Sequence, residues 1–284
     1  STDGKTKKII EFYSKKENLT IDYFKGTKSS KGGYDKALLS ITQRAKGDYI
    51  WWFGDDQIAD NAIDIIFSKI NHKDNFSFLW INSRNIDNIH DKGLDLNGDK
   101  TFYSASEIIE IDLGLLGFPS ITIFKRDEAL EAIEKAKDFI GTTLTGFYLI
   151  MHVISQADKK FIFIQEPIIL SDSKPAGEIR WYDSFQVHAV NYFLILKEFK
   201  SKIYSRSIRK AMVDQYGRIW RAVIIERSMG LSTGFASNSP KIWKMTKLYW
   251  TFPEFYIALP LMLLPRLLLI YIFQFRGKND KYPS

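Results

Sequence analysis

The chain has 284 residues, 45% of them hydrophobic and 15% aromatic, a composition that supports a folded core rather than a disordered chain. It contains no cysteine, which excludes disulfides, thiolate catalysis and cysteine-ligated zinc, and its four scattered histidines disfavour a histidine-rich metal site. The net charge of +7 is unevenly divided: residues 174–284 hold 18 Lys and Arg against 7 Asp and Glu, about +11, whereas residues 1–173 hold 22 against 26, about −4. The last third is therefore the basic part and requires its own explanation.

The first 170 residues alternate between helical and strand patterns. Apolar spacing predicts strands over 19–24, 49–53, 76–83, 118–124 and 160–170. It predicts helices over 5–14, 34–45, 59–70, 127–137 and 142–156, and Ser104-Ala-Ser-Glu107 has the spacing of a capping box before a further helix. This order implies an α/β fold with a mostly parallel sheet and flanking helices.

Two adjacent carboxylates, Asp55 and Asp56, end the apolar run that begins at Tyr49. Ligands of open α/β sheets bind beyond the carboxyl ends of such strands. Because neighbouring acids repel each other, a cation is a natural partner, and hard oxygen ligands suit Mg²⁺ or Mn²⁺, often shared with a substrate's phosphates. The alternative interpretation is a polar turn after a strand.

Helical periodicity dominates after about Trp181, with helices expected over 187–200 and 205–229 and a Gly/Ser/Asn/Pro linker over 230–240. Residues 255–275 have Arg266 as their only charge and, as one helix, would be about 31 Å long, near the thickness of a bilayer core. Pro260 and Pro265 interrupt the helical ladder, so a broken or interfacial segment competes with a clean membrane span. A buried hairpin in a soluble domain is a further interpretation.

Basic residues flank this apolar segment on both sides. They are Lys241, Lys244 and Lys247 before it and Arg276, Lys278 and Lys281 after it. Such flanks suit an anionic cytoplasmic membrane surface as partner. Nucleic acid is not the expected partner, because no recognisable nucleic-acid-binding motif is present.

Three segments near the amino terminus form an ordered set of motifs. They are Ser1-Thr2-Asp3-Gly4, Ser30-Lys-Gly-Gly-Tyr-Asp-Lys-Ala37 and Ala45-Lys-Gly-Asp-Tyr-Ile-Trp-Trp-Phe-Gly-Asp-Asp-Gln57. In this order and spacing they resemble the motifs of family 2 glycosyltransferases, which have the GT-A nucleotide-sugar fold, a Rossmann-like sheet. The similarity is to bacterial members described as abequosyltransferase-like and covers roughly residues 1 to 170. The first motif matches only the tail of the family's turn, so we expect the family's extreme amino terminus to be missing here.

This resemblance implies roles for individual residues. Asp56 would contact a Mg²⁺ or Mn²⁺ ion, and Asp55 would contact the ion or the ribose of a nucleotide-sugar donor. Asp3, Asp35 and Lys36 would lie on the nucleotide side of the site. In the family's pattern an Asn stands at the position of Ala37 and a third Asp at that of Gln57, so one possible acidic ligand is absent.

An inverting transfer also needs a general base near the acceptor hydroxyl. The family places an acid before the helix that follows the second half of the sheet, and Asp138 is the carboxylate nearest to that place. Asp138 is therefore the candidate base and Asp112 a weaker one, whereas His152 suits packing on a helix face better than catalysis.

These features predict a glycosyltransferase domain over residues 1–180, a basic helical region and linker over 181–240, and a membrane-associating tail over 241–284. The expected function is transfer of a sugar to a lipid-linked or other glycan acceptor for bacterial surface polysaccharide, at the cytoplasmic face of the inner membrane. A catalytically inactive relative that binds sugar or lipid as a scaffold is the alternative, favoured by Gln57 and the unassigned base. A nucleotidyltransferase is disfavoured, because the Gly-rich, Lys- or Arg-bearing loop of such enzymes is not visible.

Overall fold

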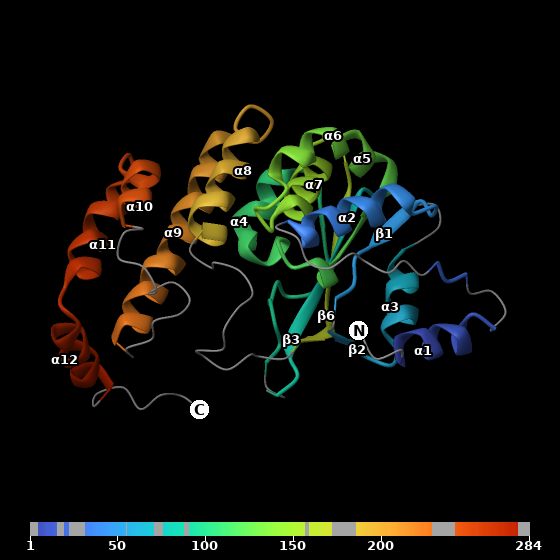
Figure 1. Cartoon of the computed structure of the whole chain (residues 1–284), viewed down its shortest axis with the longest axis horizontal. Coiled ribbons are helices and arrows are strands. Elements are labelled where there is room, and N and C mark those ends of the chain that lie inside the picture. The colour runs from blue at the N-terminus through green and yellow to red at the C-terminus, as the bar shows by residue number, and fades with distance from the viewer. Residues whose placement is uncertain are drawn as a thin grey trace.

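The protein is described here from a computed structural model, which describes residues 5–15, 20–22, 32–54, 56–70, 76–87, 91–156, 159–171, 186–228 and 242–277. It is a mixed α/β structure. A sheet with helices packed around it forms one part, and a layer of helices from the last third of the chain lies at one end (Figure 1).

A six-stranded sheet forms the centre of the first part. Its strands are β1 Tyr49–Trp51, β2 Gln57–Ile58, β3 Phe78–Asn85, β4 Lys100–Phe102, β5 Thr122–Lys125 and β6 Phe161–Ser171. The strand order is β1-β5-β3-β6-β2, and β4 pairs with β6 as well. The long strand β6 therefore has β3 along one edge, while β2 and β4 share the other.

The expectation of a mostly parallel sheet is wrong for the described strands. Only β3 and β6 pair in parallel, whereas β1 with β5, β3 with β5, β2 with β6 and β4 with β6 are antiparallel. The prediction rested on helices that alternate with strands, but a helix between two strands determines neither the partner nor the direction of the second strand. In this chain β5 returns between β1 and β3 against the direction of both, although a helix precedes it.

The helices follow the predicted pattern closely, with bounds that differ by a few residues. They are α1 Lys5–Tyr13, α2 Gly33–Arg44, α3 Ala62–Lys69, α4 Ala105–Leu116, α5 Arg126–Glu131, α6 Ile133–Ala136, α7 Thr145–Ile154, α8 Tyr192–Glu198, α9 Ser205–Ser228, α10 Ile242–Tyr249, α11 Pro253–Leu263 and α12 Arg266–Gly277. Short 3₁₀ turns occur at η1 Pro119–Ile121 and η2 Lys137–Phe139, and a π-helical turn, η3, at Gln186–Asn191. Residues 20–22 of the strand predicted over 19–24 are irregular, and the rest of that segment lies outside the described residues.

The predicted capping box at the start of α4 is confirmed. The Ser104 hydroxyl accepts the Glu107 N–H, and the Glu107 carboxylate accepts the Ser104 N–H in return. Both otherwise unpaired N–H groups are satisfied, so the first turn of α4 is set by local sequence alone.

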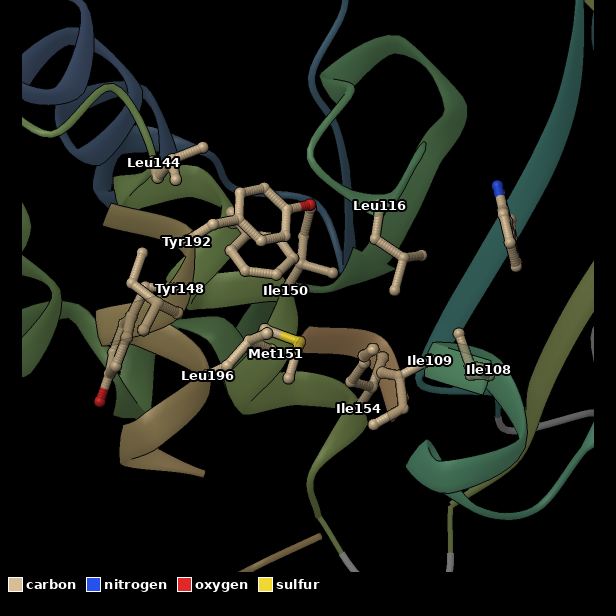
Figure 2. Packing of buried hydrophobic residues seen from close by; sticks show 14 of the residues in the cluster. Ile108, Ile109, Leu116, Leu144, Tyr148, Ile150, Met151, Ile154, Tyr192 and Leu196 are labelled. Carbon is tan, nitrogen blue, oxygen red and sulfur yellow. The ribbon is translucent and has the colours of Figure 1, made fainter. Parts of the chain in front are cut away.

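Helix α7 is the central helix of the core. All of its residues except His152 are buried. Figure 2 shows its side chains meeting those of α4 on one side and α8 on the other. The labelled residues are Ile108, Ile109 and Leu116 from α4, Tyr148, Ile150, Met151 and Ile154 from α7, and Tyr192 and Leu196 from α8, with Leu144 just before α7. This shared core joins the helices of the last third to the sheet.

The last helices form an outer layer. Helix α9 packs against α4, and α11 and α12 pack against α9 (Figure 1). The apolar segment predicted over 255–275 is divided between α11 and α12, because the chain leaves the helical conformation at Leu264, immediately before Pro265 (φ −57°, ψ 141°). No helix within the described residues is both long and apolar enough to cross a membrane.

Candidate functional site

The segment 52–56 connects two strands that lie at opposite ends of the strand order, β1 and β2. Because β1 and β3 are both antiparallel to β5, and β6 is parallel to β3, strand β1 runs in the same direction as β3 and β6. The segment therefore leaves β1 at its carboxyl end and must cross the sheet to reach β2. Carboxyl ends of strands are the usual place for ligands of open α/β sheets.

Asp56 is half-buried at the end of this crossing, and Ser120 orients it. The Ser120 hydroxyl donates a hydrogen bond of 2.5 Å to Oδ2 of Asp56. The same hydroxyl accepts the backbone N–H of Gly54 at 3.1 Å, which directs its only proton toward the carboxylate. Ser120 is itself buried, one residue before the end of η1 and two before β5. The carboxylate thus has one oxygen fixed by the turn that precedes β5.

Two tryptophans hold the crossing segment from opposite sides. Trp51 donates its Nε1–H to the backbone carbonyl of Ser120 at 2.7 Å, which ties β1 to the turn before β5. Trp52 is buried and donates to the Thr42 hydroxyl on α2 at 3.2 Å. A Cβ at Gly146 of α7 would lie 3.1 Å from the Trp52 ring, so glycine permits the close approach of α7 to this segment. The position of Asp56 therefore depends on α2, α7 and β5 together.

Asp35 is fully buried at the start of α2, and the turn before α7 surrounds its carboxylate. Oδ2 accepts the N–H groups of Gly141 at 2.7 Å and Thr143 at 3.0 Å, and Oδ1 accepts the N–H of Thr145 at 3.4 Å. Three backbone donors satisfy the acceptor oxygens of this buried carboxyl group. The structure thus shows Asp35 holding the turn that begins α7, and its predicted place on the nucleotide side of the site stays a prediction.

The turn that Asp35 holds is strained. Thr143 has a positive φ of 63°, a conformation that β-branched residues rarely adopt. The carbonyl of Thr142 accepts a hydrogen bond of 2.9 Å from the Asn191 amide of η3, and Gln186 donates to the other end of that amide at 2.9 Å. Surrounding contacts therefore impose the conformation, a pattern that is common beside functional sites.

The other site residues predicted from the sequence have no described contact with Asp56. Lys36 is exposed on the first turn of α2. Asp138 lies on η2 with its side chain 61% exposed and forms an ion pair of 2.9 Å with Lys135. This bond is also the main cause that raises the pKa of the Lys135 ammonium. Asp3 and Asp55 lie outside the described residues, and their predicted roles stay predictions.

Asp112, the weaker candidate for the base, interrupts α4 with an extended backbone (φ −158°, ψ 91°). Its side chain is 15% exposed and pairs with Arg218 of α9 at 2.8 Å, a bond that raises the pKa of the guanidinium. Both line a pocket of about 20 Å³ between the two helices, room for about one water molecule and far too little for a sugar. The pair therefore joins α4 to α9.

No group of three or more His, Asp or Glu side chains that could hold a metal ion occurs in the described part of the chain. His152 contacts Gln156 at 2.8 Å and Glu131 at 3.8 Å, and burial lowers the pKa of its imidazole, as packing on a helix face predicts.

Sequence reasoning missed two side chains. Ser120 fixes Asp56, and Asn191 binds the carbonyl of Thr142 in the turn before α7. Ser120 is a small polar residue in the apolar run 118–124, and that break in the pattern is the one local signal of a special role. Its partner could not be named, because the pairing of β1 with β5 is a long-range contact.

The fold and site thus define a mixed α/β protein with an oriented carboxylate where a strand ends at the carboxyl edge of the sheet. No family model matches the chain. Over 186 residues the chain is 25% identical to abequosyltransferase RfbV of Salmonella typhimurium strain LT2, a similarity that covers 60% of this chain and 54% of that protein. The chain therefore spans about half the length of the curated relative that it matches. This similarity supports a glycosyltransferase role at a coarse level.

Proposed function

We propose that the protein transfers a sugar from a nucleotide-sugar donor to a lipid-linked or other glycan acceptor of bacterial surface polysaccharide. The proposal includes a GT-A arrangement of the sheet, a metal-assisted inverting reaction and action at the cytoplasmic face of the inner membrane. The observation that carries it is Asp56, one oxygen of which is fixed, in the segment that follows the carboxyl end of β1 and whose motif resembles that of family 2 glycosyltransferases. The similarity to an abequosyltransferase supports the same class of reaction.

A divalent cation suits the residues at this place. Mg²⁺ in phosphate-transfer and related sites is commonly held by one or two carboxylates and completed by substrate phosphates and water, so a cluster of three acids is not required. Ser120 engages Oδ2 of Asp56, and such a bond to a ligating carboxylate fixes its orientation. Asp56, with Asp55 beside it in sequence, would hold Mg²⁺ or Mn²⁺. When bound, the ion would neutralise charge on the leaving diphosphate.

The residues of the chain then have separate tasks. The acceptor hydroxyl oxygen forms a bond to the anomeric carbon of the donor while the bond from that carbon to the diphosphate breaks, and the hydroxyl proton passes to a base. Ser120 and the two tryptophans keep Asp56 beside the diphosphate. Asp138 remains the proposed base: Lys135 engages its Oδ2 at 2.9 Å, and Oδ1 is the oxygen that would accept the proton.

The direct test is the change Asp56→Ala, assayed by donor-dependent release of nucleoside diphosphate with Mn²⁺ across a set of nucleotide sugars. We expect release by the wild-type chain with one donor and loss of release in the variant. Asp60→Ala, a change at an exposed acid four residues away, is the matched control and retains activity. Undiminished release by the Asp56→Ala variant would refute the assigned role.

The second candidate function is a catalytically inactive scaffold. Gln57 in place of an acid and the engagement of Asp138 by Lys135 favour it. Such a scaffold would bind sugar or lipid, and a ligand of this kind would raise its melting temperature, because it binds the folded state alone. It would release no nucleoside diphosphate from any donor.

A further inference from the structure

Helix α11 is apolar around most of its circumference, and among the described elements it packs chiefly against α9. Its sequence from Phe255 to Leu263 contains no charged residue. A helix that is apolar on all sides is normally buried on all sides. Here Phe255, Ala258 and Met262 are buried where the helix meets α9, whereas Ile257 is 73% exposed. The outward side of α11 is therefore apolar and uncovered.

Helix α12 continues this surface beyond the break at Pro265. Leu269 is buried, whereas Leu267 is 79% exposed. We define the apolar face by its large exposed side chains, which are Trp250, Tyr256, Ile257, Leu263, Leu267 and Leu268. Large apolar side chains gathered on neighbouring helices that pack on the same helix, and left exposed, mark a site of interaction with a partner or a membrane.

The charges beside the apolar face are almost all positive. Lys247 and Arg266 are exposed on α10 and α12, and Arg209 and Arg221 are exposed on the supporting helix α9. Glu254 is the one acid in the sequence of α10, α11 and α12, and it is half-buried. Positive charge next to exposed leucine and aromatic side chains is complementary to an interface of acyl chains and anionic head groups.

We propose that the apolar face binds the surface of an anionic lipid bilayer, with α11 and α12 lying in the plane of its interface. Trp250 and Tyr256 supply aromatic rings of the type enriched at the depth of the head groups, and Leu267 and Leu268 enter the acyl region. The break at Leu264 and Pro265 lets two short helices lie side-on against α9. This mode of binding is peripheral and independent of the proposed sugar transfer.

A second copy of this chain is a less suitable occupant. Two copies that met through this face would each contribute the exposed cations Lys247 and Arg266 to one interface, and an excess of like charge in an interface is unfavourable. Anionic lipid instead neutralises these charges. The composition of the surface therefore favours lipid over self-association.

The test uses the full chain and two kinds of vesicle, pure phosphatidylcholine and an equimolar mixture of phosphatidylcholine and phosphatidylglycerol. In flotation, we expect the wild-type chain to bind the mixed vesicles at low salt, with weaker binding at high salt and to pure phosphatidylcholine. The double change Ile257→Glu and Leu267→Glu should weaken binding to the mixed vesicles at least about tenfold, since two aliphatic side chains that would enter the lipid are replaced by acids. Both positions are exposed, so the fold is retained.

Ile63→Glu is the matched control, because Ile63 is 44% exposed on α3, away from the apolar face. It should bind the mixed vesicles as the wild-type chain does. Equal flotation of the double variant and the wild-type chain would overturn the proposal. A different result would also overturn it: the wild-type chain binds neither kind of vesicle and elutes as a dimer, while the double variant elutes as a monomer.

Discussion

Asp35 and Thr143, 108 positions apart in the chain, are joined by a hydrogen bond of 3.0 Å from the Thr143 N–H to Oδ2 of the Asp35 carboxylate. The same oxygen accepts the Gly141 N–H, so one carboxylate at the start of α2 defines the turn that begins α7. Gly146 of α7 then contacts Trp52 of the segment that leads to Asp56. The geometry of the candidate site therefore depends on a residue that has no described contact with it.

The change Asp35→Ala should lower the free energy of unfolding by about 3 kcal/mol, because three backbone N–H groups, one of them buried and two part-buried, lose their acceptor. Asp35→Asn keeps one acceptor oxygen and should cost less. Urea denaturation followed by circular dichroism measures both changes. Asp214→Ala is the control: its exposed pair with Lys210 on α9 contributes little, and the change should cost less than about 0.5 kcal/mol. A variant Asp35→Ala as stable as the wild-type chain would contradict the structural role.

Ser120 provides a second prediction, about activity rather than stability. Ser120→Ala should reduce donor turnover about 10- to 100-fold and raise the Mn²⁺ concentration needed for half-maximal rate, because the Asp56 carboxylate loses the bond that orients it.

Ser77→Ala is the matched control for this change. Ser77 is also buried and also donates its hydroxyl to a carboxylate, that of Glu128 at 2.9 Å, but it has no described contact with Asp56. It should lose stability without a change in metal dependence. If both variants alter the metal dependence equally, Ser120 does not act through Asp56.

Local sequence predicted the features whose physical causes are local. The reciprocal bonds of Ser104 and Glu107 follow from a spacing of three residues, and they start α4 where the capping box placed it. The end of α11 before Pro265 follows from the clash of a proline ring with the residue that precedes it. Helix positions were predictable for the same reason, since an apolar stripe needs no knowledge of its partner.

Long-range pairing was not predictable. The sequence shows 49–53 and 118–124 as apolar runs, but nothing in either run indicates that the strands they contain, β1 and β5, pair antiparallel. The roles of Ser120 and Asp35 depend on that pairing and on the approach of α7 to α2, contacts that bridge 64 and more than 100 positions. The resemblance singled out Asp35 as a site residue, but only the structure shows that its carboxylate accepts hydrogen bonds from the backbone of the turn before α7.

Removal of divalent cations should abolish sugar transfer and leave the fold intact. The described residues hold no cluster of three ligating side chains, so an ion held by one or two carboxylates and the donor's phosphates contributes little to the donor-free chain. We expect chelation to stop nucleoside diphosphate release and Mn²⁺ or Mg²⁺ to restore it. The melting temperature without donor should change little on chelation. Transfer that persists in chelator would contradict the metal-assisted mechanism.

The imidazole of His152 should make stability fall in mild acid. Burial, with Lys202 nearby, lowers the pKa of this group in the folded chain below its ordinary value of about 6.5, and Glu131 opposes the shift only in part. Above that pH the imidazole is neutral in both the folded and the unfolded chain, so it has no effect on stability.

As pH falls below about 6.5, the unfolded chain takes up a proton that the folded chain does not. The free energy of unfolding therefore decreases by at most about 1.4 kcal/mol per pH unit until the imidazole of the folded chain titrates. Melting temperatures measured between neutral pH and pH 5 should therefore fall more steeply for the wild-type chain than for His152→Gln, whose amide does not titrate and can still bond Gln156. If melting temperature falls equally with pH in the two proteins, protonation of His152 is not the cause of the loss of stability in acid.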